Sequence, residues 1–427
     1  MPKKITNAKD PVWAVLTELG LRRPLKSHQF WTRLSKRFPK EEKEFLRVLQ
    51  AREAGLAEDP YAMKNVTLEF ANAVASQFDS NRLYTFLFWL TKEIEPPEGA
   101  KILDVGCDNG VLTCALARLY PSIEITGIDC KLNSVEIARQ RIDQLNLTNA
   151  FVEHADIEDF ANPHNGRGYD VIITSNVMHE LFASNSAIID SLTVGRFDET
   201  ALSYKGIWES IQIEKSKLGA LQKINQLLHE DGVYISLDRW ATFDKHAMWT
   251  QALEEEDFQI SISHSYVLEY NGPDYTTESM PVTVASCPLE YRLTPEETLS
   301  VFSYNRFLNK SGVLRYEDPN AAEIMFSALS AEDFLNIKVS YKNGSGDLIM
   351  RQGIAGALTY LLMTSSRGAR ELTIAPISCC PELFSELERF LSKVRPHSEI
   401  EGWADKDTLN HYSLATDLLD GLHQIDR

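Results

Sequence analysis

The chain has 427 residues, more than one ordinary hydrophobic core accommodates, so we expect two or three structural units. Its apolar fraction of 44% and charged fraction of 24% are typical of a soluble globular protein, and no apolar run is long enough to span a bilayer. The net charge of -18 disfavours broad binding to nucleic-acid phosphates.

The charge is unevenly distributed. Residues 1–52 hold 13 Lys and Arg against 5 Asp and Glu, and the remainder is strongly acidic. A basic arm could contact RNA or a protein partner, although a solvated helical face explains the same pattern. The start of the chain lacks the apolar stretch of a secretory signal, and the six cysteines form no CxxC pair or zinc-spaced cluster. We therefore predict a cytoplasmic protein with reduced thiols and no metal.

Residues 1–95 are predicted to form a helical N-terminal unit. Apolar residues recur there at three- and four-residue spacing, and the run EPPEGA then breaks the pattern with two prolines and a glycine. A different architecture is expected to begin near residue 96.

Residues 96–290 alternate between strand-like and helix-like segments, which predicts an α/β domain with a mostly parallel sheet. The predicted strands are 101–106, 123–129, 150–156, 169–176 and 232–240, and the predicted helices are 111–120, 134–145, 177–182 and 218–230. Residues 258–270 and 280–287 are expected to close the sheet edge as an antiparallel hairpin. An insertion at about 183–216 is either a lid or substrate wall, or has no chemical role.

Residues 291–427 are predicted to form an α+β unit. Its expected helices are 294–308, 330–337 and 381–394, with a hairpin at 338–352 and a strand at 370–378. Residues 354–366 begin with the apolar run IAGALTYLLM, which we interpret as a buried helix too short to cross a bilayer.

The turn after the first strand carries the clearest motif, Asp104-Val105-Gly106-Cys107-Asp108-Asn109-Gly110. A dinucleotide fingerprint, G-x-G-x-x-G, fails here because Asp108 and Val111 occupy two glycine positions. Acid-x-Gly-x-Gly-x-Gly instead resembles the first motif of class I S-adenosylmethionine-dependent methyltransferases, a resemblance that extends over about residues 95–290. It implies a Rossmann-like, mostly parallel seven-stranded sheet with helices on both faces, and S-adenosyl-L-methionine as the cofactor.

The resemblance also implies roles for single residues. Asp129, which ends the second strand, would hold the ribose hydroxyls, Asp156 would contact the adenine amino group, and Ile157 would pack on the adenine ring. The whole predicted cofactor site is Asp104, Gly106, Cys107, Asp108, Gly110, Asp129, Cys130, Asp156, Ile157 and Ser175. Alternatives remain for several of these, because the glycines could serve packing, Asp129 could cap a helix, and Asp156 could be structural.

Asp108 departs from the family pattern, which has a second glycine at this position. Asp and Asn tolerate left-handed backbone angles better than other non-glycine residues, so the turn can still form. The extra carboxylate could crowd the amino acid end of the cofactor. Two interpretations therefore stay open: the site binds the cofactor, or the site is degenerate and inactive.

His179 and Glu180 follow the fourth strand, where the family borders the acceptor. His179 has a suitable ordinary pKa for a general base, Glu180 is the second candidate, and packing under the cofactor is the alternative role of His179. The predicted function is methyl transfer to a small molecule or peptide. The alternatives are an RNA or protein methyltransferase guided by the basic arm, and a non-catalytic scaffold. The flanking units are candidate surfaces for a second copy of the chain or a protein partner.

Overall fold

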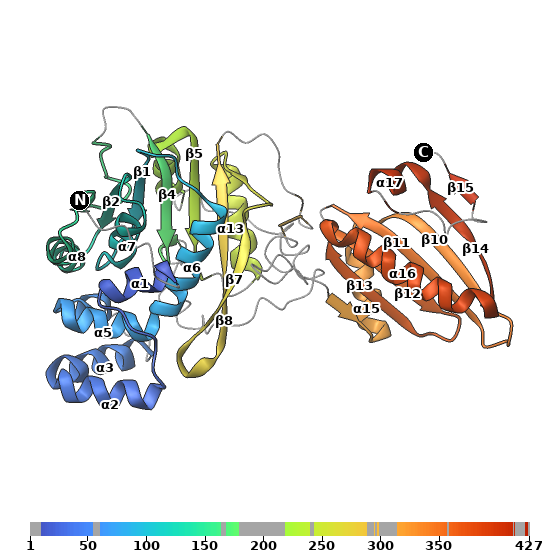
Figure 1. Cartoon of the computed structure of the whole chain (residues 1–427), viewed down its shortest axis with the longest axis horizontal. Coiled ribbons are helices and arrows are strands. Elements are labelled where there is room, and N and C mark those ends of the chain that lie inside the picture. Colours follow the sequence, from blue (N-terminus) through green and yellow to red (C-terminus); the bar gives the residue numbers. More distant parts are fainter. Residues whose placement is uncertain are drawn as a thin grey trace. The chain divides into compact units, whose positions relative to one another are not determined.

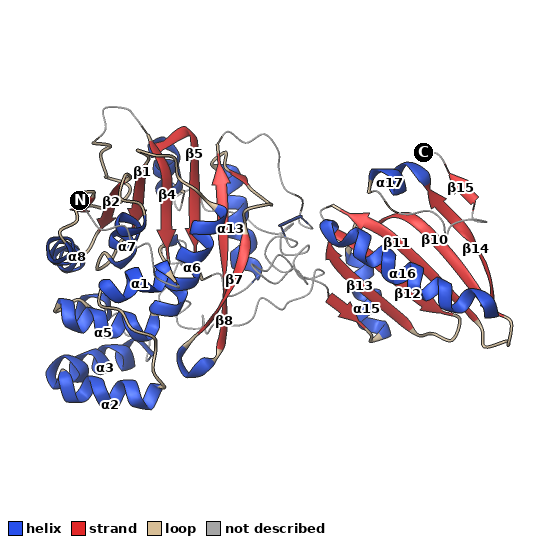
Figure 2. Cartoon of the chain, viewed as in Figure 1, coloured by secondary structure: helices blue, strands red, loops and turns tan. Residues whose placement is uncertain are grey.

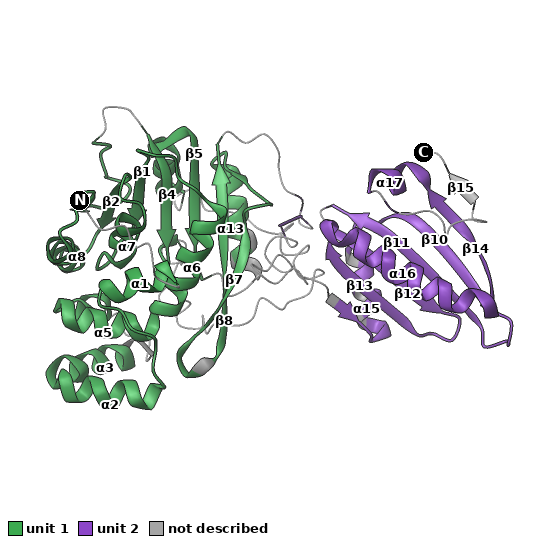
Figure 3. Ribbon diagram, viewed as in Figure 1, with its two compact units in different colours: residues 1–197, 212–292 green, residues 198–211, 293–427 purple. Residues whose placement is uncertain are grey.

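The computed structural model describes residues 10–53, 60–163, 168–178, 218–239, 243–287, 314–356, 358–412 and 423–425, and single positions elsewhere. The described residues up to 287 belong to one compact unit and those from 314 onward to a second (Figure 3). His179, Glu180 and the insertion at 183–216 lie outside the described residues, as does most of the helix predicted at 294–308.

The first unit begins with helices, as the spacing of apolar residues predicts. They are α1 (Pro11–Glu18), α2 (Ser27–Arg37), α3 (Pro39–Glu53), α4 (Pro60–Lys64), α5 (Leu68–Phe78) and α6 (Ser80–Glu93). Buried aromatic side chains join α2, α3 and α5, with Phe30, Phe45 and Phe70 at the centre of that cluster. Contacts of α1 with α7 (Val111–Leu119), of α4 and α5 with α8 (Leu132–Leu145), and of α6 with β7 (Tyr266–Asn271) place this helical layer against the sheet domain (Figure 1).

The sheet of the first unit has the strand order β3-β2-β1-β4-β5-β8-β6, with β7 also paired to β8. The strands are β1 (Lys101–Val105), β2 (Glu124–Asp129), β3 (Ala150–His154), β4 (Tyr169–Ser175), β5 (Leu228–Leu237), β6 (Gln259–Ile260), β7 (Tyr266–Asn271) and β8 (Thr277–Ser286). The first five strands pair in parallel, and β8 runs antiparallel to its neighbours. The predicted mixed α/β fold with a closing antiparallel hairpin is confirmed (Figure 2).

The described helices of this sheet domain are α7 (Val111–Leu119), α8 (Leu132–Leu145), α12 (Gly219–Leu227) and α13 (Phe243–Glu255). Helices α7 and α8 connect successive parallel strands, which brings the carboxyl ends of β1 and β2 to one edge of the sheet. The apolar runs of β1 and β4 are almost wholly buried, as expected for parallel strands covered on both faces.

The sheet in the structure differs from the predicted sheet in two details. Residues 258–270 form two strands, β6 and β7, because a turn at 261–265 interrupts them, so the described part of the sheet has eight strands rather than seven. The helix predicted at 218–230 ends at Leu227, and β5 begins at the next residue, Leu228.

The second unit is built on a seven-stranded sheet with the order β15-β14-β10-β11-β12-β13-β9. Its elements are β9 (Leu314–Tyr316), α15 (Pro319–Ala328), β10 (Glu332–Tyr341), β11 (Asp347–Ala355), β12 (Leu358–Ser365), β13 (Arg370–Pro376), α16 (Cys380–Val394), β14 (Ser398–Asp405), α17 (Lys406–His411) and β15 (His423–Ile425). All pairs are antiparallel except β14 with β15. Helix α16 lies across the sheet (Figure 1) and buries Leu383, Phe384, Leu387 and Leu391, a helical spacing.

Two helix predictions in this unit are wrong. Residues 354–366 are not a buried helix but the end of β11 and the whole of β12, joined at Gly356. Residues 332–337 of the second predicted helix are instead the start of strand β10. The first five residues of β12 are all buried, so the alternation that marks a strand is absent from the sequence. The predicted hairpin, the strand at 370–378 and the helix at 381–394 are confirmed.

Candidate functional site

The turn between β1 and α7 alternates between ordinary and left-handed backbone angles. Gly106, Asp108 and Gly110 have φ of 70°, 49° and 73°. Asp108 therefore adopts the left-handed conformation that the family's glycine would supply, at the modest cost that Asp and Asn pay for it.

The two glycines are required by close packing. A Cβ on Gly106 would lie 2.3 Å from Cγ2 of Val177, and a Cβ on Gly110 would lie 2.7 Å from Cβ of Ala138. Val177 follows β4 and Ala138 lies on α8, so the turn is pressed between the neighbouring elements of the sheet edge. These contacts agree with the packing role that was considered for the two glycines. Their contact with a ligand stays a prediction.

Asp129 joins the end of β2 to the turn. Its Oδ2 accepts the N–H of Asp108 at 2.9 Å, and its Oδ1 accepts the N–H of Lys131 at 2.8 Å. Partial burial raises the pKa of this carboxyl, while the two backbone donors oppose the rise. Because a carboxylate offers about four lone-pair positions, Asp129 retains acceptor capacity for a diol.

Asp104 is only 1% exposed and lies beneath the turn. Its Oδ2 accepts a hydrogen bond of 2.6 Å from the Thr113 hydroxyl. Burial raises the pKa of its carboxyl to about 7; Thr113 opposes the rise, and the carboxylates of Asp129 and Asp108 add to it. The charged form of Asp104 is therefore costly in the absence of a cation.

We expect Asp104→Asn to stabilise the first unit more at high pH than at low pH. The pKa of this carboxyl in the folded state lies above its ordinary value of 3.8. Its stabilising contribution is therefore present below pH 3.8 and is lost as the pH rises through about 7. The amide can accept the Thr113 hydrogen bond without carrying a charge. Urea unfolding, followed by hydrogen exchange in β1 and α7, should show a larger gain at about pH 8 than at about pH 5. Equal gains at both values would contradict this assignment.

The remaining predicted residues occupy different positions around the sheet edge. Asp156 is exposed after β3, and its Oδ1 accepts the N–H of Glu158 at 3.0 Å, whereas Ile157 is buried at 6% exposure. Cys130 is exposed. Cys107 packs its side chain among buried residues of α8 and β3, and burial raises its thiol pKa, so its side chain belongs to the core.

Ser175 ends β4 on the same edge. Among the described residues, its Oγ and the Oδ1 of Asn176 are buried without a hydrogen-bond partner. Asn176 has a left-handed φ of 60°. Unsatisfied buried polar atoms beside a strained residue are characteristic of ligand-contacting positions, which supports the inclusion of Ser175.

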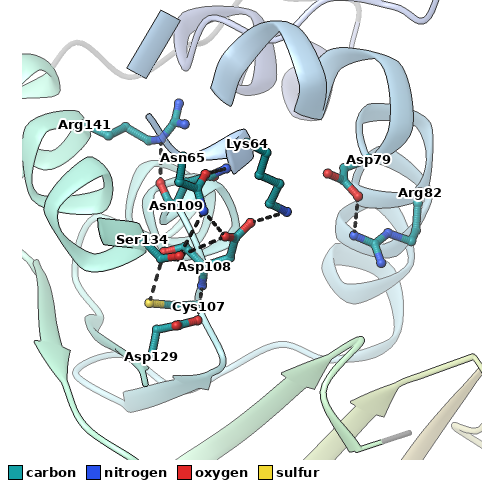
Figure 4. Close-up of polar contacts among 10 residues, drawn as sticks. All are labelled: Lys64, Asn65, Asp79, Arg82, Cys107, Asp108, Asn109, Asp129, Ser134 and Arg141. Atoms are coloured by element: carbon teal, nitrogen blue, oxygen red, sulfur yellow. Dashed lines mark hydrogen bonds and ion pairs between the residues drawn. The ribbon is translucent and has the colours of Figure 1, made fainter. Parts of the chain in front are cut away.

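The sequence did not reveal two residues of this site, Lys64, the last residue of α4, and Asn65, which directly follows it (Figure 4). Lys64 Nζ forms an ion pair of 2.6 Å with Oδ2 of Asp108, and Asn65 Nδ2 donates to Oδ1 of Asp108 at 2.5 Å. Helical periodicity can predict that α4 is a helix. It cannot predict that this helix packs against a turn more than 40 positions later. The one indication in the sequence was the unexplained carboxylate of Asp108, because a carboxylate at this position needs a partner group.

The described cysteines are all free, and no three His, Cys, Asp or Glu side chains of the described segments gather in a metal-binding arrangement. None of the described helices is long and apolar enough to cross a membrane.

Residues 97–272 match the family model of a methyltransferase domain. The chain is 35% identical over 94 residues to a ubiquinone biosynthesis O-methyltransferase of Psychrobacter arcticus, covering 22% of this chain and 35% of that protein. It is 25% identical over 183 residues to a malonyl-[acyl-carrier protein] O-methyltransferase of Anoxybacillus flavithermus, covering 40% of this chain and 66% of that protein. It is 30% identical over 91 residues to ribosomal RNA small subunit methyltransferase C of Buchnera aphidicola, covering 21% and 27%. Each match spans less than two thirds of the relative.

The strand order, the glycine-bearing turn and the acid at the end of β2 define a Rossmann-like cofactor-binding domain. With the family match, residues 97–272 are a class I S-adenosylmethionine-dependent methyltransferase domain. The resemblance drawn from the sequence is thereby confirmed.

Proposed function

We propose that the chain is an active S-adenosylmethionine-dependent methyltransferase whose acceptor is a small molecule or a peptide. The observation that carries the proposal is the pair of carboxylates, Asp104 and Asp129, organised beneath and beside one left-handed turn. The names of two relatives support it, because both are O-methyltransferases and one acts on a malonyl group held by an acyl carrier protein.

The residues present fit this cofactor. Asp129 retains oxygen lone pairs for the ribose hydroxyls, and the buried charge of Asp104 favours a nearby cation. The Ser175 hydroxyl, which has no hydrogen-bond partner among the residues that the structure describes, can serve a polar group. Asp156 and Ile157 would contact the adenine. The cofactor supplies a methyl group activated by a sulfonium.

The protein's part in the reaction is alignment and proton transfer. A pocket that orients the acceptor and excludes water provides most of the rate in such a displacement. His179 is our candidate for the base that accepts the acceptor's proton, with Glu180 as the second candidate. Both lie outside the described residues.

His179→Ala is expected to lower kcat by about 100-fold or more with little change in cofactor affinity, because only the proton acceptor is removed. The rate is measured with the acceptor found in the labelling experiment below, and affinity for S-adenosylhomocysteine by calorimetry. An unchanged kcat would remove His179 from the catalytic role.

Calorimetry with S-adenosylhomocysteine tests the proposal directly. Saturable binding is expected, whereas no heat at high ligand concentration would favour the non-catalytic scaffold. The acceptor class is then identified by incubating the enzyme with methyl-labelled cofactor and cell extract separated into small-molecule, peptide, protein and RNA fractions. Label in the small-molecule or peptide fraction is expected.

RNA methylation is the second candidate, favoured by exposed basic residues around α2 and by the ribosomal RNA methyltransferase among the relatives. Deleting residues 1–52 would remove buried core residues such as Leu16 and Phe30, so the arm is tested by substitution. Changing Lys26, Arg33 and Lys36 together to Gln should weaken salt-sensitive retention on heparin if the arm binds RNA. Unchanged retention would count against this candidate.

A further inference from the structure

The carboxylate of Asp108 is turned toward the helical layer. Lys64 Nζ contacts its Oδ2, Asn65 Nδ2 donates to its Oδ1, and the Ser134 hydroxyl donates to Oδ1 at 3.4 Å (Figure 4). Asn65 is 2% exposed and also donates to Ser134 Oγ at 2.9 Å, while its own carbonyl accepts from Asn109 Nδ2 at 3.2 Å. We call Lys64 and Asn65 the α4 clamp.

The clamp neutralises a charge that would otherwise be costly. The side chains of Lys64 and Asp108 are only 15% and 28% exposed. Burial alone would raise the pKa of the Asp108 carboxyl, but the Lys64 ammonium and the Asn65 amide hold it below its usual value. Removing one partner from such a pair leaves the other as a poorly solvated charge.

Further contacts hold the α4 clamp against the turn between β1 and α7. Asn133 Nδ2, on α8, donates to the carbonyl of Ala62 at 3.0 Å. The guanidinium of Arg141 bridges the two layers, because Nε donates to the carbonyl of Asn109 at 3.1 Å and Nη1 donates to that of Leu19 at 2.8 Å. The helical layer is therefore connected to the turn and to α8 at several points by buried and partly buried polar contacts.

We propose that Lys64 and Asn65 are positioning residues, which hold the Asp108 carboxylate on α4 and out of the path of the cofactor's amino acid end. This inference rests on the proposed function. The cofactor carries a carboxylate beside an ammonium at that end, so a released Asp108 would place a second carboxylate next to the cofactor's carboxylate in one small site. The clamp explains how this chain keeps an aspartate where the family has glycine.

The test compares two nucleosides that share adenine, ribose and thioether. S-adenosylhomocysteine has the amino acid end, and 5′-methylthioadenosine lacks it. For Lys64→Met, calorimetry should show a dissociation constant about tenfold or more higher for S-adenosylhomocysteine, because the freed carboxylate opposes its carboxylate. Affinity for 5′-methylthioadenosine should change less than about twofold, since this ligand has only a methyl group, and no charge, at that end. General damage to the fold would weaken both ligands equally and would overturn the proposal.

A rescue variant makes the test specific. Asp108→Gly restores the family residue, and in that background Lys64→Met should no longer weaken S-adenosylhomocysteine binding, because the carboxylate it neutralised is gone. Lys92→Met, at an exposed position on α6, is the matched control and should leave both affinities unchanged. An equal loss from Lys64→Met in both backgrounds would overturn the inference.

The two proposals fail in different ways. A wild-type protein that binds neither nucleoside contradicts the proposed function. A wild-type protein that binds S-adenosylhomocysteine, together with a Lys64→Met variant that binds it equally well, contradicts only the positioning role of the clamp.

Discussion

Gly110→Ala is expected to destabilise the first unit by about 2–5 kcal/mol. A Cβ at a φ of 73° costs about 1–2 kcal/mol in backbone strain. The same atom would lie 2.7 Å from Cβ of Ala138 and 3.1 Å from its Cα, an overpacking that costs about 1–3 kcal/mol more. Hydrogen exchange of the α7 amides under increasing urea measures the loss within this unit.

Gly99→Ala provides the matched control. Gly99 has a similar φ of 77°, but nothing lies within 4 Å of an added Cβ. This variant should therefore show the backbone strain without the overpacking. If the two variants lose the same stability, the close approach of the turn to α8 carries no energetic weight.

Asp129→Ala is expected to weaken the binding of S-adenosylhomocysteine by about 1–3 kcal/mol, because the ribose hydroxyls lose their acceptor and two backbone N–H groups lose theirs. Since both nucleosides contain the ribose, 5′-methylthioadenosine should lose affinity to a similar degree. This pattern differs from that expected for Lys64→Met, which should affect only the ligand with the amino acid end. Calorimetry measures both.

Asp129→Asn is the control for charge. The amide keeps one acceptor oxygen at nearly the same position, so the loss should be smaller than that of the alanine variant. Wild-type affinity for both ligands in Asp129→Ala would exclude this residue from the cofactor site.

The central sheet could be predicted because its strands and helices are separated by clear turns and each element keeps one period. The apolar runs of β1 and β4 and the spacing of α8 carry enough local information to specify a parallel sheet. In the second unit, β12 could not be recognised, because a strand buried over five consecutive residues has the same composition as a buried helix. Tertiary packing decides between the two.

The candidate site was predictable where its residues lie in one continuous motif. Asp104, Gly106 and Gly110 occupy the turn that the sequence indicates, and Asp129 lies beside it because consecutive parallel strands end at one edge. Lys64 and Asn65 were not predictable, since their approach to Asp108 depends on how the helical layer packs on α8. No local pattern encodes a contact over that separation in sequence.

The α4 clamp affects where this protein can be divided. The family match begins at residue 97, yet Asp108 depends on Lys64, and Arg141 donates to the carbonyl of Leu19. A fragment that begins at residue 97 would retain the whole recognised domain. It would leave the Asp108 carboxylate and the Arg141 guanidinium at its surface without these partners. For expression or domain-exchange work, the folding boundary of this protein therefore lies near its first helix, well upstream of the boundary that family similarity suggests.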